Sequence, residues 1–187
     1  MRVNELSCEK IGIIDGVSNL DVEGVNFSES NRSKSSNSST HGDYMIRFVK
    51  QINPNINIYY FDATDNDGKI SLNKILEGLE WMKANNISRV NMSLSTTSNE
   101  EELQKWISRN QEEITIYASY NNLVNSLDYP AMYKGVIASG CDDRRVTYKS
   151  TDKCYYNNNV VLSNDLFNVY RGNSYLSLLM LLQDGSK

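Results

Sequence analysis

The strongest constraint on the fold is an alternation of short apolar segments with amphipathic ones along most of the chain. Strand-like apolar segments occupy residues 10–14, 56–61, 89–94, 114–118 and 135–139. Apolar residues recur at helical spacing in residues 44–52, 71–85, 99–109 and 175–182. Because neighbouring parallel strands need long crossover connections, usually helices, this order predicts an α/β fold. We expect a mainly parallel β-sheet flanked by helices on both faces.

Individual residues mark where two of these helices begin. Ser71 stands just before the second amphipathic segment, and its hydroxyl can accept from a first-turn N–H group, so we expect it to be an N-cap. Glu100, Glu101 and Glu102 open the third segment. Their negative charges suit the positive end of a helix dipole.

Three polar stretches interrupt the alternation. Residues 28–40 contain seven serines and no apolar residue, which predicts a flexible loop. Residues 142–159 are polar and rich in Tyr and Asn, which predicts a short hairpin or an irregular segment. The run from Asp65 to Ile70 looks like a calcium loop. With Gly68 at its sixth position, however, it lacks the first ligand and the bidentate carboxylate, so we expect a tight turn there.

Composition limits the size of the molecule and its partners. With 187 residues the chain is long enough for one domain, and we treat residues 1–187 as a single minimal domain. Its 19 basic and 23 acidic residues leave a net charge of −4, which argues against binding to nucleic acid or to an anionic membrane surface. No apolar run reaches the roughly 18 residues of a membrane span. We therefore expect neither nucleic acid nor a membrane as a partner.

The cysteine and histidine content bears on compartment and metal chemistry. The three cysteines, Cys8, Cys141 and Cys154, are odd in number and widely spaced, which argues against a disulfide framework and favours a reducing cytoplasm. Residues 1–10 hold no apolar segment of a secretory signal, which also favours a cytoplasmic location. His41 is the only histidine and no Cys-x-x-Cys occurs, so we expect no metal site and no cofactor.

Five polar residues stand where an open α/β sheet gathers its functional groups, at the carboxyl ends of strands and at helix starts. Asp15, Ser93 and Asn121 end or follow strand-like segments, His41 precedes a helix, and Ser174 begins the last one. A serine nucleophile needs a base, and the base needs a carboxylate that orients it. Asp15, His41 and Ser174 supply these three groups. The Asn121 side-chain amide and the Ser174 backbone N–H would stabilise the oxyanion.

Taken one at a time, these residues have simpler interpretations. Asp15 precedes a glycine and suits a turn, Ser174 suits an N-cap, and Asn121 suits a turn as well. A single histidine beside a glycine is more often a loop or cap residue than a base. The catalytic interpretation depends on finding all four together.

Seven motifs occur in an order that matches a known family. They are KIGIIDG (10–16), HG (41–42), NPNINIY (53–59), ILEGLEW (75–81), VNMSL (90–94), YPAMYKGVI (129–137) and GNSY (172–175). Over residues 10–183 they resemble the subtilisin-like serine proteases, the subtilases. The resemblance implies a subtilisin-like three-layer fold, here truncated. It also implies that Ser93, Leu94, Ser95 and Tyr120 belong to the substrate site, with the backbone of residues 93–95 pairing with the substrate.

Several residues depart from the family pattern. Asp43 and Tyr44 stand where the family usually has Thr-His. Ser95 and Thr96 replace two glycines of the specificity pocket, and Tyr120 replaces the glycine before the oxyanion asparagine. These side chains are expected to narrow or block that pocket, or to favour a small residue at the cleavage site. The family's propeptide and C-terminal portion have no counterpart, so we expect a minimal subtilase.

Two functional hypotheses fit these residues and departures. The first is an intracellular serine endopeptidase that makes a limited cut in a specific peptide, such as removal of a leader from a ribosomally made peptide. The second is a catalytically degenerate subtilase that binds a peptide or a partner protein without cleaving it. The apolar segment 175–182 also leaves room for a partner subunit or a homo-oligomer, although burial within the domain is the expected case.

Overall fold

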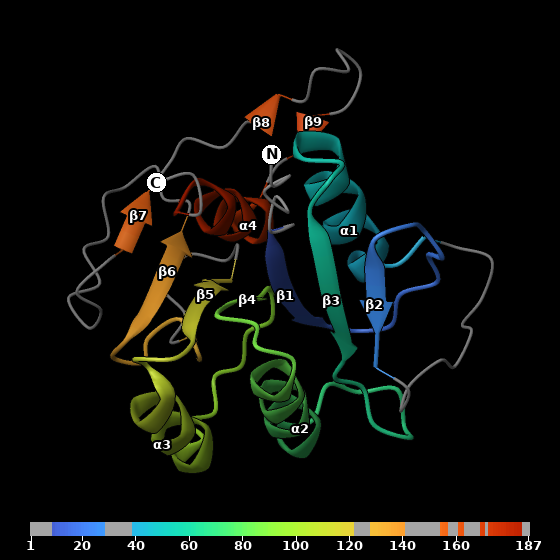
Figure 1. Cartoon of the computed structure of the whole chain (residues 1–187). Helices are drawn as coiled ribbons and strands as arrows, with labels where there is room; N and C mark the ends of the chain where they lie inside the picture. Colours follow the sequence, from blue (N-terminus) through green and yellow to red (C-terminus); the bar gives the residue numbers. More distant parts are fainter. Residues whose placement is uncertain are drawn as a thin grey trace, which may run out of the picture.

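A seven-stranded sheet in which every pairing is parallel forms the centre of the computed structural model (Figure 1). The structure describes residues 9–28, 39–121, 128–140, 154–156, 161–162, 169–170 and 172–184. The sheet order is β2-β3-β1-β4-β5-β6-β7. The strands are β1 (Lys10–Asp15), β2 (Val25–Phe27), β3 (Asn57–Asp62), β4 (Arg89–Met92), β5 (Thr115–Ser119), β6 (Val136–Gly140) and β7 (Cys154–Tyr156). Two further strands, β8 (Val161–Leu162) and β9 (Val169–Tyr170), pair with each other in antiparallel fashion.

Helices cover both faces of the sheet, as Figure 1 shows. On one face lie α1 (His41–Ile52) and α4 (Asn173–Asp184), and on the other lie α2 (Leu72–Ala84) and α3 (Glu101–Asn110). Successive side chains of a strand point to opposite faces, so β1 contributes to two cores. Ile11 and Ile13 pack with α1 and α4, whereas Ile14 packs with α2 and α3. The predicted three-layer α/β architecture is confirmed.

The close approach of α2 to the sheet explains the glycine in the middle of β1. A Cβ atom added to Gly12 would lie 2.6 Å from the sulfur of Met82 on α2 and 3.0 Å from Val90 on β4. A larger residue would push this helix away from the strand.

Most of the predicted elements are present with bounds that differ by one to three residues. The Ser71 hydroxyl accepts from the Lys74 N–H at 3.4 Å, so the predicted N-cap is confirmed. The tight turn is also confirmed, because the Asp65 carbonyl accepts from the N–H of Gly68, which has a φ of 73°. Residues 29–38 of the predicted loop lie outside the described part of the chain.

Two features of the sheet were not predicted. The three residues of β2 extend the sheet beyond β3, and β7 falls within the polar stretch 142–159. We expected a hairpin or an irregular segment in that stretch, but β7 pairs in parallel with β6, so it is not one arm of a β6–β7 hairpin. The other residues of the stretch lie outside the described part.

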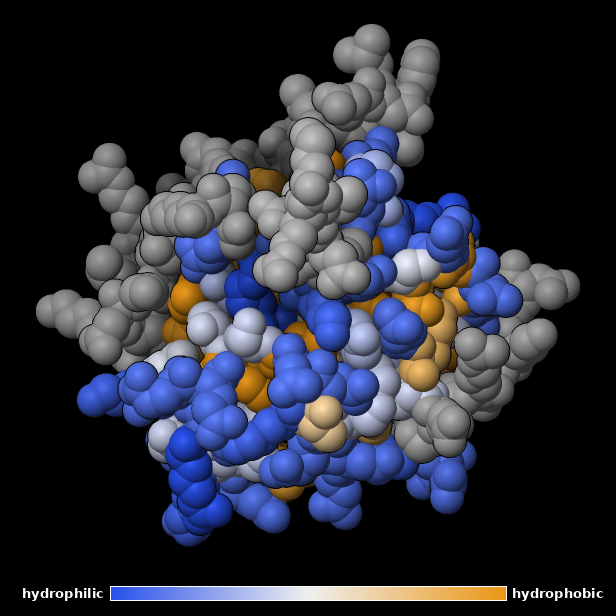
Figure 2. Space-filling view, viewed as in Figure 1, coloured by the Kyte–Doolittle hydropathy of each residue, from blue (hydrophilic) through white to orange (hydrophobic). Residues whose placement is uncertain are grey.

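The apolar residues of α4 are buried within the domain, as expected. Leu178 and Leu181 are fully buried against the sheet and α1, and Leu176 and Leu182 are nearly so. The face shown in Figure 2 is mostly hydrophilic, with hydrophobic residues visible in separated areas. Within the described ranges, no helix combines the length and the hydropathy that a membrane span requires.

Candidate active site

The sheet topology brings Asp15 and Ser93 to the same edge. Strands β1 and β4 are parallel neighbours, and Ile14 lies opposite Met92 in their register. Asp15 is the next residue of β1, and Ser93 is the first residue beyond β4. The carboxyl ends of parallel strands meet at one edge of a sheet, which is where sites of open α/β sheets form.

The first residue of α1 contacts the carboxylate that ends β1. His41 Nδ1 lies 2.8 Å from Asp15 Oδ2, and the Gly16 N–H donates to the other carboxylate oxygen at 2.7 Å. The Asp15 side chain is only 7% exposed, whereas that of His41 is 48% exposed. A buried carboxylate therefore orients an imidazole whose other side remains accessible, which is the arrangement a general base requires.

The same contact sets the charge state of His41. The hydrogen bond with Asp15 raises the pKa of the imidazole, burial lowers it, and the negative charge of Asp15 raises it further. The net effect is a pKa above the ordinary histidine value. The site thus stabilises the protonated imidazole that forms when a base accepts a proton from a serine.

The start of α4 is anchored to the ends of β5 and β6. The Asn173 side-chain amide donates to the carbonyl oxygens of Tyr120 at 2.9 Å and of Asn121 at 3.1 Å. The Asn173 carbonyl oxygen accepts from the Ser139 hydroxyl at 2.9 Å. These contacts place Ser174, the second residue of α4, beside the segment that contains Asn121. The N–H groups of a first helical turn, which include that of Ser174, have no partner within the helix.

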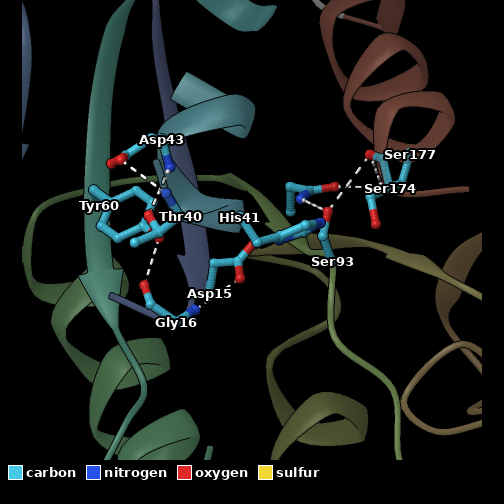
Figure 3. A network of polar contacts seen from close by, with 10 residues as sticks. Asp15, Gly16, Thr40, His41, Asp43, Tyr60, Ser93, Ser174 and Ser177 are labelled. Carbon is cyan, nitrogen blue, oxygen red and sulfur yellow. Dashed lines mark hydrogen bonds and ion pairs between the residues drawn. The ribbon is translucent and has the colours of Figure 1, made fainter. Parts of the chain in front are cut away.

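A chain of hydrogen bonds joins α4 to the end of β4 (Figure 3). The Ser177 hydroxyl lies 2.7 Å from Asn91 Oδ1 and 2.8 Å from the Ser174 carbonyl oxygen. The Asn91 side-chain amide donates to the Ser93 hydroxyl at 2.6 Å, and this hydroxyl lies 3.5 Å from the Ser174 carbonyl oxygen. Ser93 and Ser174 therefore meet at the edge of the sheet where Asp15 and His41 pair.

The predicted catalytic groups are brought together to different degrees. Asp15 and His41 are in direct contact, and Asn173 brings Ser174 close to Asn121. Among the contacts of the described residues, no hydrogen bond joins His41 to Ser174. Asn121 is exposed, and its backbone N–H donates to the Asp128 carboxylate at 2.9 Å. Within the same described ranges, no three His, Cys, Asp or Glu side chains gather as metal ligands.

Known proteins share both the sequence pattern and the fold. No family model matches the chain. The thermostable alkaline protease of Halalkalibacterium halodurans is 29% identical over 152 residues, which cover 74% of this chain but only 42% of that protease. Subtilisin DY of Bacillus licheniformis is 25% identical over 190 residues, covering 90% of this chain and 69% of the subtilisin. The solved structure of the prenylagaramide maturation protease PagA matches 95% of this chain and 77% of its own, with a TM-score of 0.62 and 18% identity.

The chain thus resembles subtilisin-like proteases in its sequence and in its fold. Asp15 and His41 contact each other, and Ser174, the predicted nucleophile, lies at the start of α4.

The residues of the predicted substrate site, and those that depart from the subtilase pattern, differ in exposure. Ser95 and Thr96 are exposed, whereas Ser93 and Leu94 are half-buried. Thr96 forms an antiparallel bridge with Tyr129, with hydrogen bonds of 3.0 and 2.9 Å in the two directions, which fixes the end of this segment. The Tyr120 side chain is buried in the core on the side of α2 and α3. The assignment of residues 93–95 and Tyr120 to a substrate site stays a prediction.

The Asp43 side chain caps α1. The Asp43 carboxylate accepts from the Thr40 N–H, and the Thr40 hydroxyl accepts from the Asp43 N–H, which is a capping box. The spacing of Thr40 and Asp43 carries this signal in the sequence. The raised pKa of His41 comes from Asp15 on β1 and not from this cap.

Sequence reasoning also missed Tyr60, which lies on β3 behind the Asp15–His41 pair. Its hydroxyl donates to the Gly16 carbonyl oxygen at 2.6 Å. Burial raises the pKa of Tyr60 well above its ordinary value, and the negative charges of Asp15, Asp62 and Asp43 add to the shift. The hydroxyl therefore remains protonated and keeps its role as a donor. No local sequence pattern predicts this contact, because it joins residues that are 44 positions apart in the chain.

Proposed function

We propose that this subtilase is a serine endopeptidase that makes a limited cut in a specific peptide. The observation that carries the proposal is the 2.8 Å contact between His41 Nδ1 and Asp15 Oδ2 at the edge of the sheet where α4 presents Ser174. A buried carboxylate, an accessible imidazole and a serine at a helix start are the three groups that acyl transfer to serine requires. The likeness of the chain to an alkaline protease and to a subtilisin supports the same chemistry.

The first half of the reaction transfers the peptide acyl group to the enzyme. Ser174 Oγ attacks the carbonyl carbon of the scissile bond while His41 Nε2 accepts the hydroxyl proton. Asp15 holds the imidazole through Nδ1 and stabilises its positive charge. The Asn121 side-chain amide and the Ser174 N–H donate to the negative oxygen of the tetrahedral intermediate. The intermediate then breaks its C–N bond, and His41 gives the proton to the departing amine.

The second half restores the enzyme. His41 removes a proton from water, the resulting hydroxide attacks the acyl carbon, and the C–O bond to Ser174 breaks as His41 returns the proton to Oγ. Both halves require a hydrogen bond between His41 Nε2 and Ser174 Oγ. Hydrogen bonds of this kind often form fully only in the complex with substrate.

The substrate is proposed to be an extended peptide that pairs with the backbone of residues 93–95. Ser95 is exposed, and the antiparallel bridge between Thr96 and Tyr129 holds the end of the segment in place. Addition of a peptide strand to such a segment uses main-chain hydrogen bonds for affinity and side-chain pockets for specificity. The likeness to a protease named for the maturation of prenylagaramide supports limited processing, such as leader removal, over bulk digestion.

We place this activity in the cytoplasm, with peptide or protein substrates and with neither nucleic acid nor a membrane as partner. Three widely spaced cysteines support a reducing compartment, and the net charge of −4 gives no support for phosphate binding. A second copy of the chain, or a partner subunit, remains part of the proposal, and light scattering at several protein concentrations tests it.

A peptide-cleavage assay tests the proposed activity. Mixed peptides are incubated with the wild-type protein or with Ser174→Ala, and the products are identified by mass spectrometry. We expect cleavage at a small set of related sites by the wild type and a loss of at least about a thousandfold in rate with Ser174→Ala. Cleavage that persists in Ser174→Ala contradicts the assignment of the nucleophile.

Two observations favour a second candidate, a degenerate subtilase that binds a peptide without cutting it. No hydrogen bond among the described contacts joins His41 to Ser174, and Ser95, Thr96 and Tyr120 stand where the family has glycine. Under this alternative, the wild type and Ser174→Ala retain the same peptides on an affinity column and neither releases cleaved products.

A further inference from the structure

The carboxylate of Asp43 makes more contacts than a helix cap needs. Its Oδ2 atom accepts from the Thr40 N–H at 3.0 Å, which completes the capping box. Its Oδ1 atom accepts from the Ser18 hydroxyl at 2.8 Å and from the Asn19 N–H at 2.7 Å. The Asp43 side chain therefore holds two segments of chain together, the start of α1 and the segment that follows β1.

These hydrogen bonds keep the buried Asp43 side chain ionised. The residue is 2% exposed, and no ion pair of the described residues includes it. Burial opposes ionisation, but the hydrogen bonds from Thr40, Ser18 and Asn19 outweigh it and lower the pKa of Asp43 below its ordinary value. A carboxylate held by several fixed donors is an anchor of defined geometry, because each donor restrains it from a different direction.

The two segments that Asp43 joins carry the two partners of the proposed catalytic pair. Ser18 and Asn19 follow Asp15 closely in the chain, and Thr40 directly precedes His41. Figure 3 shows Asp43, Thr40 and Tyr60 on the side of His41 away from Ser93. A displacement of the start of α1 relative to the end of β1 would lengthen the bond between His41 and Asp15.

We propose that Asp43 is a positioning residue that holds the His41 imidazole in hydrogen-bonding contact with Asp15. The inference rests on the proposed function for its catalytic consequence, but the contact itself exists independently of any activity. Among the described contacts, none joins Asp43 to Asp15, so Asp43 acts through the backbone on either side of the pair. The competing interpretation is that Asp43 stabilises α1 as any cap does, with no effect on the geometry of His41.

A matched control separates these two interpretations. Ser71 caps α2 on the opposite face of the sheet, and its hydroxyl accepts from the Lys74 N–H. Ser71→Ala removes a helix cap on the other face of the sheet, whereas Ser18→Ala and Asp43→Asn remove contacts of the anchor. Ser18→Ala keeps the charge of Asp43, so any effect it has on His41 is not a loss of that charge. It also serves as the decisive variant if Asp43→Asn does not fold.

The only histidine of the chain gives a direct readout by NMR in untagged protein. Asp15 on β1 is in direct contact with the imidazole. Asp62 on β3 lies opposite Asp15 in the strand register, and Asp43 is on the same helix as His41. In the wild type, we expect a downfield Nδ1–H proton of His41 that exchanges slowly with water because Asp15 holds it. We expect Ser18→Ala to speed this exchange and Asp43→Asn to broaden the signal beyond detection.

Kinetics gives the second readout. We expect kcat to fall by about tenfold in Asp43→Asn and less in Ser18→Ala, with KM within about twofold of the wild type, since small displacements of a base cost rate more than binding. Ser71→Ala should lower Tm without changing the Nδ1–H signal or kcat. The inference is overturned if both anchor variants keep the wild-type Nδ1–H signal while their Tm falls as in Ser71→Ala. Absence of peptidase activity in the wild type would contradict the proposed function and leave the NMR result to decide the role of Asp43.

Discussion

The Ser177 hydroxyl lies 2.7 Å from Oδ1 of Asn91, and both residues are completely buried. This contact joins α4 to the central strand β4. The Asn91 side-chain amide in turn donates to the Ser93 hydroxyl at 2.6 Å. The orientation of α4 is therefore coupled to the end of the strand beside which Asp15 and His41 pair. A polar bridge in an otherwise apolar core fixes one arrangement of helix and sheet, because any other arrangement leaves its polar atoms without partners.

Replacement of Ser177 by alanine should destabilise the fold. The variant leaves the buried Asn91 Oδ1 without its donor, which typically costs about 1–3 kcal/mol. Urea denaturation followed by circular dichroism measures the free energy of unfolding. Ser108→Ala is the matched control, since Ser108 is an exposed serine on α3, and it should change that free energy by less than about 0.5 kcal/mol. Equal effects of the two variants would show that the Ser177–Asn91 bridge contributes nothing to stability.

Asn173 makes a second link between α4 and the sheet. Asn173→Ala removes the hydrogen bonds to the Tyr120 and Asn121 carbonyl oxygens, so it should release the start of the helix. We expect a loss of about 1–3 kcal/mol in stability and a lower kcat from the displaced Ser174. Asn99→Ala, at an exposed position before α3, is the control. A folded Asn173→Ala protein with wild-type kcat would mean that this anchor does not position the nucleophile.

The tight contact between Gly42 and Tyr60 predicts that Gly42→Ala is poorly tolerated. An added Cβ would lie 1.9 Å from the Tyr60 hydroxyl oxygen and 3.0 Å from the Val17 carbonyl oxygen. Overpacking of this kind costs about 1–3 kcal/mol or more, which a fall in Tm reports. Gly16→Ala is the control, because its added Cβ would have no neighbour closer than 3.9 Å. Tyr60→Phe should partly rescue Gly42→Ala, and a lack of rescue would argue that the hydroxyl is not the obstacle.

The pH dependence of stability and activity should follow the raised pKa of His41. Because the pKa is higher in the folded state than in the unfolded state, the pair stabilises the fold fully below about pH 6.5. This contribution is lost as the pH rises through the folded-state pKa. Activity should change in the opposite sense, since the neutral imidazole is the base, so kcat/KM rises through the same pKa.

Asp15→Asn tests the cause of that shift. Removal of the carboxylate should lower the pKa of His41, as measured by NMR titration of this single histidine, and move the acid limb of the kcat/KM profile to lower pH. Asp65→Asn, in an exposed turn, should leave both unchanged. An unchanged pKa in Asp15→Asn would contradict the hydrogen bond as the source of the shift.

The sequence predicted the features that depend on local patterns. The buried run of β1 ends at Asp15 and forms a strand as expected. The helix that carries His41 begins three residues before the first residue of its expected segment, because the Thr40–Asp43 capping box starts it there. The strand β2 was missed because three residues carry too little pattern. The roles of Asn91, Asn173 and Ser177 depend on contacts between distant segments, so no spacing in the chain reveals them.

Active-site labelling with a fluorophosphonate tests the central claim most directly. The reagent phosphonylates a serine that a neighbouring base activates, and mass spectrometry of the digested protein identifies the modified residue. The account predicts one adduct, on Ser174, which is lost in Ser174→Ala and strongly slowed in His41→Ala, with circular dichroism showing that both variants fold. A folded wild-type protein that takes up no label, or that takes it up at another serine, would contradict the proposal that Asp15, His41 and Ser174 form a catalytic triad.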